Sequence, residues 1–186
     1  MASVGQSQKL ITVEEYAQLP PSDTPTELVK GRIVEMNLPK PKHGTIVTRA
    51  ARILDEFAEK HDLGIVPCAD AGVVTERDPD TLRGADVAFF SYDRLPRDAD
   101  LDRYPTSAPE IVLEVRSPSD RWAKVLEKVA EYLNAGVLRV CVLDPPTRTI
   151  HVYLPAQPEF QLTEDEELTL PELHEDFREA VSRFFP

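Results

Sequence analysis

Two acidic residues stand in apolar runs of the sequence, where an ionised side chain needs a partner. Glu114 lies in the middle of IVLEV, and Asp86 precedes the apolar residues of ADVAFF. A charged carboxylate in or beside a core is costly unless it is paired or binds a metal. If the two runs form neighbouring strands, both carboxylates can converge on one cation, and oxygen ligands suit Mg²⁺ or Mn²⁺. Glu27, in a predicted hairpin, could supply a third oxygen ligand.

Three basic residues could act beside these carboxylates. Arg116 is two positions after Glu114, so the two side chains point to the same face of a strand. Lys128 lies at the boundary of the apolar face of the following helix, from which a long side chain can reach the edge of the sheet. There it could orient or deprotonate an attacking water and stabilise a phosphate, as hydrolysis of a phosphodiester requires. His43, which opens another helix, could bind a phosphate or complete the ligand set.

Each of these residues also has a purely structural interpretation. Asp86 could cap backbone amides at a strand end, and Glu114 could form a buried salt bridge with Arg116 or Arg83. The lysine and the histidine, taken singly, are typical of solvated helix positions. The residues considered alone therefore leave catalytic and structural roles open.

The first half of the chain predicts one short helix, a hairpin, a long helix and several strands. Thr12 and a glutamate three residues later have the form of a capping box, and Lys30–Gly31 has the form of a tight turn. Apolar residues recur every three or four positions over 43–60, which indicates an amphipathic helix. Strands are predicted at 64–69, 71–76 and 85–91, and an exposed loop at 92–109.

A strand, a helix and a strand follow within about thirty residues and predict a βαβ unit with parallel strands. The strands are 111–115 and 138–144, and Ser119 is the predicted N-cap of the helix that Gly136 ends. TRTIHVY is expected to pair back as a hairpin, and 170–185 to form a final amphipathic helix. The predicted architecture is a mixed α/β (α+β) sheet flanked by helices, in a single domain over residues 1–186.

Composition limits the partners. The formal charge is −12 at pH 7, which argues against broad, non-specific binding to a polyanion, because such binding depends on Lys and Arg. Any nucleic-acid contact must therefore be local. Two basic stripes could provide it, one at Lys40, Lys42, Arg49 and Arg52 and the other at Arg116, Arg121, Lys124 and Lys128.

The compartment is predicted to be the cytoplasm. No apolar run approaches the roughly 18 residues that span a bilayer, and the segment MASVGQSQKL lacks the features of a signal peptide. Cys68 and Cys141 have no Cys or His at metal-site spacing, so both are expected to be buried free thiols.

Several of these segments together resemble a known family. ELVKGRIVEM, the helix from His43, RGADVAFF and EIVLEVRSPSDR…EKVAEYLNAGVLRVCVLDPPTRTIHVY are similar to the Uma-two family of restriction-endonuclease-like proteins, in the PD-(D/E)XK nuclease superfamily. The resemblance covers about Thr12 to Tyr153. It implies a restriction-endonuclease-like fold with a Mg²⁺-type site. By position, Asp86 and Glu114 correspond to the metal-binding acids.

The same resemblance matches Glu27 to the acid of the N-terminal hairpin and His43 to the histidine that opens the long helix. Lys128 corresponds to a lysine displaced from the strand onto the helix. Two positions depart from the pattern. Ala85 replaces the proline before the metal-binding aspartate, and Arg116 takes the strand position of the usual lysine. A guanidinium stays protonated, so catalysis would depend on Lys128.

The sequence thus favours a Mg²⁺- or Mn²⁺-dependent endonuclease that hydrolyses DNA, with Asp86, Glu114 and Glu27 as metal ligands. The alternative is an inactive nuclease-fold module that binds nucleic acid or a protein partner. Either protein is expected to be a homodimer with no membrane association. A carboxylate-pair enzyme acting on sugars is disfavoured, because the chain has one tryptophan and 7% aromatic residues.

Overall fold

The structure is a computed structural model that describes residues 9–186. Residues 1–8 lie outside the described part. They make up most of the segment MASVGQSQKL, which was considered above for a signal peptide. The elements follow one another as α1 (Val13–Ala17), β1 (Thr26–Val29), β2 (Arg32–Glu35), α2 (Pro41–His61), β3 (Gly64–Ile65), β4 (Cys68–Glu76), β5 (Thr81–Ser91), β6 (Ile111–Val115), α3 (Trp122–Asn134), β7 (Arg139–Asp144), β8 (Thr149–Tyr153), β9 (Phe160–Leu162), β10 (Glu167–Thr169), β11 (Arg178–Ala180) and the 3₁₀ helix η1 (Val181–Phe184).

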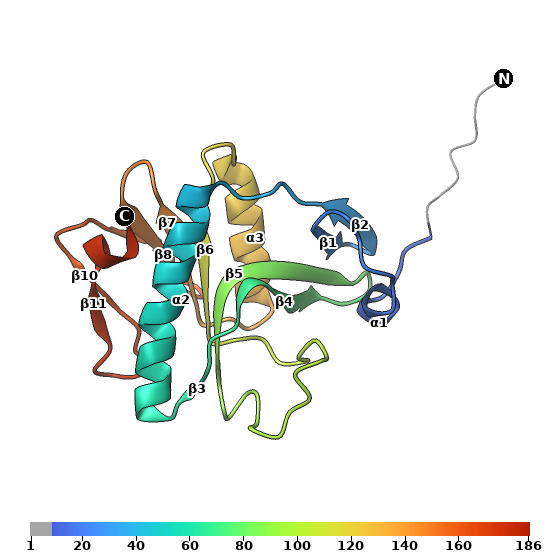
Figure 1. Cartoon of the computed structure of the whole chain (residues 1–186), viewed down its shortest axis with the longest axis horizontal. Coiled ribbons are helices and arrows are strands. Elements are labelled where there is room, and N and C mark those ends of the chain that lie inside the picture. Colours follow the sequence, from blue (N-terminus) through green and yellow to red (C-terminus); the bar gives the residue numbers. More distant parts are fainter. Residues whose placement is uncertain (1–8) are drawn as a thin grey trace.

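A mixed sheet of nine strands forms the centre of the fold (Figure 1). Its order is β2-β1-β5-β6-β7-β8-β9, and β3 and β4 also pair with β5. β6 and β7 are parallel because α3 carries the chain back to the same end of the sheet, whereas the other pairs are antiparallel. β10 and β11 form a separate two-stranded sheet. The predicted βαβ unit and mixed sheet are therefore confirmed.

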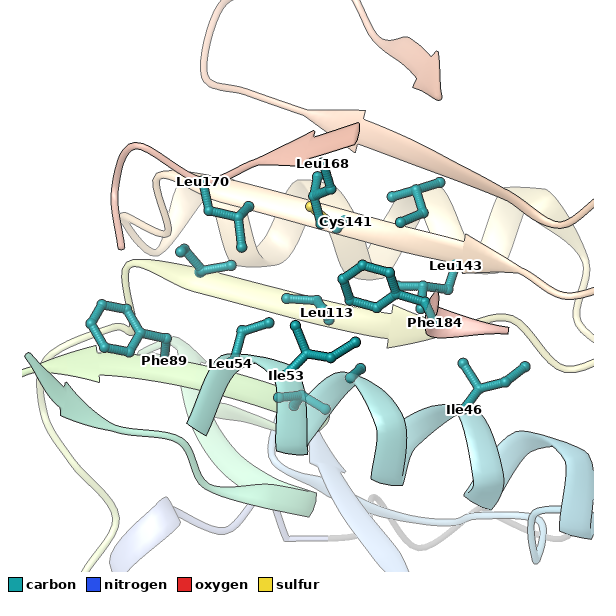
Figure 2. Packing of buried hydrophobic residues seen from close by; sticks show 14 of the residues in the cluster. Ile46, Ile53, Leu54, Phe89, Leu113, Cys141, Leu143, Leu168, Leu170 and Phe184 are labelled. Carbon is teal, nitrogen blue, oxygen red and sulfur yellow. The ribbon is translucent and has the colours of Figure 1, made fainter. Parts of the chain in front are cut away.

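Helices cover both faces of this sheet because its central strands are apolar on both sides. Val87 and Phe89 of β5 pack towards α2, whereas Ala88 and Phe90 pack with residues of α3. Figure 2 shows the larger core, in which Ile53 and Leu54 of α2 lie against strand residues such as Leu113, and to which Phe184 of η1 also belongs. The two helices thus approach the sheet from opposite sides.

Two predictions about turns and helix starts in the N-terminal part are confirmed. Thr12 caps α1, since its hydroxyl accepts a bond from the Glu15 amide and the Glu15 carboxylate accepts one from the Thr12 amide. Lys30 and Gly31 both have positive φ, at 49° and 71°, as a two-residue hairpin turn between right-twisted strands requires. The hairpin places Glu27 on the inner strand, β1, next to β5.

The predicted helix over 170–185 is wrong. Its apolar residues do recur at helical spacing, but the chain there forms turns, β11 and η1. Leu168 of β10 pairs with Glu179, and Leu170, Phe177 and Phe184 are all buried in the larger core. Tertiary packing thus satisfies the same apolar residues without a helix.

Two smaller predictions also fail. Ser119 is not an N-cap, because α3 begins at Trp122, and the Asp120 carboxylate accepts a bond from the Ser117 amide and forms a turn there instead. Cys68 is exposed, since it stands where β4 pairs irregularly with β5, whereas Cys141 is buried as predicted. The loop 92–109 contains no helix or strand. None of the helices within residues 9–186 is long and apolar enough to cross a membrane.

Candidate metal and phosphate site

The two acidic residues singled out by the sequence lie on neighbouring strands. β5 and β6 are antiparallel with Val87 opposite Leu113, so the next pair in this register is Asp86 opposite Glu114. Side chains of directly opposite residues have Cβ atoms about 5 Å apart and share one face of a sheet. Asp86 also accepts a bond of 2.7 Å from the Val115 amide, which fixes its carboxylate at the end of β6. The fold therefore brings the two carboxylates together.

Lys128 reaches this position from α3 and lies between carboxylates. Its Nζ is 3.1 Å from Glu114 Oε2 and 3.3 Å from Glu27 Oε1, and it donates a 2.8 Å bond to the Gly84 carbonyl. Burial alone would lower the pKa of Lys128, but Glu114, Glu27 and Asp86 raise it above its usual value. The ammonium therefore keeps its proton at physiological pH. In this arrangement it can donate hydrogen bonds and neutralise charge, but it cannot serve as a base.

Glu114 is held by two groups of the same helix. Its carboxylate accepts bonds from Lys128 and, at 2.8 Å, from the Tyr132 hydroxyl. Burial raises the pKa of Glu114 to about 7, and the negative charge of Asp86 adds to this, although Lys128 opposes the shift. Burial thus makes the ionised form of Glu114 less favourable than that of an exposed glutamate.

Glu27 anchors cations from two other elements. Its Oε1 accepts a 3.0 Å bond from the Gly84 amide and lies near Lys128, and its Oε2 is 2.8 Å from Arg83. Arg83 also binds Glu131 of α3 at 2.6 Å. Burial would raise the pKa of Glu27, but Lys128 and Arg83 lower it, so Glu27 is ionised. Glu27 thus pairs with two cations, Lys128 and Arg83, and this arrangement favours an anchoring role for it.

His43 joins the site from the first turn of α2. Its Nε2 is 3.3 Å from Asp86 Oδ2, and its buried Nδ1 has no hydrogen-bond partner within the described residues. Burial would lower the pKa of His43, but the hydrogen bond to Asp86 and the charges of Asp86 and Glu114 raise it. Asp86 thus favours the protonated form of the histidine.

Arg116 belongs to a different pair. Its guanidinium is 2.7 Å from Asp144 and lies over the Trp122 ring, 5.2 Å from the centroid. It binds neither of the facing carboxylates. The structural alternative for Glu114, a salt bridge to Arg116 or Arg83, is therefore replaced by the pair with Lys128.

Two residues near the site escaped the sequence analysis. Tyr132 is four residues after Lys128, so the helical period places the two side chains on one face of the helix. This spacing was the sequence signal that the Tyr132 hydroxyl lies near Lys128. Asp70 lies in an irregular part of β4 with a positive φ of 63°. It lines the cleft, described below, that also contains Asp86 and Glu114. Burial and the charge of Asp86 raise the pKa of Asp70. No sequence pattern marks an interruption of this kind in a strand.

The site lies in a cleft of about 850 Å³ between the hairpin, α2 and α3. Seven acidic residues line it, against five basic ones, which are Lys40, Arg83, Arg116, Lys124 and Lys128. An excess of carboxylates repels an anionic substrate at short range. A further cation would therefore make the entry of a phosphate into this cleft more favourable.

Within residues 9–186, no three His, Cys, Asp or Glu side chains are already clustered as a ready-made cage for a metal ion. Mg²⁺, however, commonly binds through one or two carboxylates and completes its coordination with waters and substrate phosphates. Asp86 and Glu114, facing each other across two strands, match that smaller requirement. The donor set therefore fits a divalent cation of this type.

Comparison with known proteins identifies the family. The profile of the Uma2 family, described as "Putative restriction endonuclease", matches residues 13–182, so this chain belongs to that family. Membership supports a nuclease, as the resemblance in the sequence predicted. The search of curated proteins found no match.

A solved structure confirms the fold. It is titled as a putative nuclease belonging to DUF820 from Anabaena variabilis, and it is similar to this chain with a TM-score of 0.81 and 21% sequence identity. The match covers 94% of this chain and 97% of the other. At this identity the comparison establishes a shared nuclease-like fold. The predicted restriction-endonuclease-like architecture is therefore confirmed.

The raised pKa of Glu114 predicts a pH-dependent stability. Its folded value of about 7 exceeds its ordinary value of 4.5, so folding favours the protonated form. The contribution of Glu114 to the free energy of unfolding is full below about pH 4.5 and declines as the pH rises to about 7. Glu114→Gln removes this decline. Denaturant unfolding of both proteins across this range should show the variant gaining stability relative to the wild type as the pH rises; parallel curves would contradict the shift.

Proposed function

We propose that this protein is a divalent-metal-dependent nuclease that hydrolyses phosphodiester bonds of DNA. The observation that carries the proposal is the position of Asp86 opposite Glu114, with the ammonium of Lys128 beside them in an acidic cleft. Membership of a family described as "Putative restriction endonuclease" supports the choice of nucleic acid as substrate. Mg²⁺ or Mn²⁺ is the proposed cofactor.

Asp86 and Glu114 are the proposed metal ligands. A buried carboxylate whose pKa lies near 7 gains most from a nearby cation, which would keep it ionised. His43 and the Val115 amide hold Asp86 in place, and Tyr132 holds Glu114. When bound, such a cation supplies Lewis-acid activation of the phosphate and lowers the pKa of a water ligand.

Lys128 is proposed to donate hydrogen bonds and to stabilise negative charge through its ammonium group. Because its ammonium stays protonated, it orients a water or a phosphate oxygen and stabilises negative charge that develops there. Glu27 and the Gly84 carbonyl aim the ammonium at Glu114. Deprotonation of the attacking water by Lys128, which the sequence left open, is therefore disfavoured.

A second candidate is a nuclease-fold module without catalytic activity. Two observations favour it: Lys128 is already engaged by three acceptors, and Arg116 is committed to Asp144. Such a module would bind nucleic acid or a protein without cutting it. A homodimer in the cytoplasm remains our prediction for either candidate.

Metal binding tests the proposal directly. Titration calorimetry with Mn²⁺ should show binding by the wild-type protein that Glu114→Gln and Asp86→Asn each weaken about tenfold or more, since each removes a charged ligand. Glu127→Gln is the matched control, because Glu127 lines the same cleft but is exposed and pairs with Lys124. DNA cleavage with Mg²⁺ should follow the same order. Unchanged Mn²⁺ binding in both ligand variants would refute the site.

Lys128→Met separates the nuclease from the inactive module. Cleavage should be lost while Mn²⁺ binding is retained, because the carboxylates remain and a repelling charge has gone. The variant should also unfold more easily, by about 3–5 kcal/mol, because Glu27 and Glu114 lose their buried partner. Lys124→Met, one turn earlier on an exposed position, should change neither property appreciably. Cleavage by Lys128→Met, measured with the metal bound and the fold intact, would remove Lys128 from the mechanism.

A further inference from the structure

A second depression, of about 820 Å³, adjoins the cleft along α2. No acidic residue lines it within the described part of the chain, although the protein carries a formal charge of −12. Its polar lining consists of Thr45 and Thr48 together with three arginines, Arg49, Arg52 and Arg183. A local concentration of guanidinium groups on an otherwise acidic protein is the arrangement that binds an anion.

The depression and the cleft are continuous. Gly44 and Thr48 of α2 line both of them. Gly44, Thr48 and Arg52 are four residues apart and so lie on one face of the helix, which leads from His43 away from the site. A Cβ atom at Gly44 would meet nothing within 4 Å, so the surface between the two hollows is open. An extended polymer can thus cross from one to the other.

The arginines are in two different states. Arg49 is half-buried and donates a hydrogen bond to the Phe185 carbonyl, which ties the C-terminal segment to α2. Arg52 and Arg183 have side chains that are 61% and 58% exposed, and each has one acidic partner, at 3.9 Å and 2.9 Å. The pair of Arg52 with Glu56 is exposed on both sides and contributes little to stability, so the Arg52 guanidinium can turn to a phosphate at small cost. The side chain of Glu179, the partner of Arg183, is only 16% exposed, but a guanidinium has five N–H donors, so Arg183 can bind a phosphate while it keeps this pair.

The spacing fits a nucleic-acid strand. His43 and Arg52 are nine residues apart, which at 1.5 Å per residue corresponds to about 13.5 Å along the helix. One strand of B-DNA advances about 3.4 Å per nucleotide, so this distance spans about four nucleotides. Figure 1 shows η1, which carries Arg183, beside α2.

We propose that this depression is a second phosphate-binding site, in which Arg52 holds the DNA backbone about four nucleotides from the bond that is cleaved and Arg183, which lines the same depression, adds a second contact. The inference rests on the proposed function, since it takes DNA as the polymer in the cleft. The arginines of α2 would then attract a polyanion to a protein that is acidic as a whole. The metal site would then need to offset only the charges next to the cleaved phosphate.

The test is DNA binding without cleavage. Fluorescence polarisation with a labelled duplex in EDTA compares the wild type with the double variant Arg52→Ala/Arg183→Ala over a range of salt concentrations. Loss of two charged contacts should weaken binding about tenfold to hundredfold at low salt. The slope of log K against log salt should fall by about 1.8, or about 0.9 for each contact.

Arg97→Ala/Arg103→Ala is the matched control. Both residues are exposed and paired with one acid each, so the control removes the same charge, and Arg97 pairs with Asp62 at the far end of α2. Its binding and salt slope should stay close to the wild-type values, because distant charges are screened within about 10 Å at ordinary salt. Thermal unfolding of all three proteins checks that the fold is retained.

The outcomes separate the two proposals. Equal losses in both double variants would show a general effect of net charge and overturn the second phosphate site. Unchanged binding by Arg52→Ala/Arg183→Ala, in a protein that still cleaves DNA with Mg²⁺, would overturn the site and leave the nuclease in place. A wild-type protein that neither binds nor cleaves DNA would overturn both.

Discussion

The ion pairs of Lys128 with Glu114 and Glu27 are the interaction on which the rest of the site depends. They join four elements at one end of the sheet: Glu27 comes from β1, Gly84 from β5, Glu114 from β6 and Lys128 from α3. Removing one partner of a buried pair leaves an uncompensated charge, which is costly. The hairpin, the two central strands and the crossover helix are therefore held in register by the same charges that face the cleft.

The carboxylates of this network outnumber the ammonium group that they surround. One ammonium serves two carboxylates, Asp86 adds a third, and burial keeps the pKa of Glu114 near 7. A divalent cation between Asp86 and Glu114 would offset the remaining negative charge of the carboxylates. It would thereby favour the binding of a phosphate in the cleft. The energetic cost of the clustered carboxylates and their proposed use as a metal site thus have the same physical origin. Membership of the Uma2 family supports a nuclease.

Local patterns predicted most of the fold but only part of the site. Two apolar runs on either side of a segment with helical spacing predicted the βαβ unit. Asp86 and Glu114 were recognisable because carboxylates are rare in apolar strands. Their direct opposition depends on the register of β5 and β6, and the anchoring of Glu27 depends on Arg83; both are long-range. The C-terminal helix failed for the same reason, since helical spacing also suits turns that pack on a core.

The most direct test of the metal site is the anomalous scattering of Mn²⁺ in crystals of the wild-type protein and of Glu114→Gln. In the wild type we expect one strong peak between the carboxylates of Asp86 and Glu114, with His43 and Lys128 in place beside them. In the variant we expect this peak to be lost or greatly weakened. A wild-type crystal that binds Mn²⁺ elsewhere, or a peak that survives unchanged in the variant, would contradict the claim that these two facing acids form the metal site.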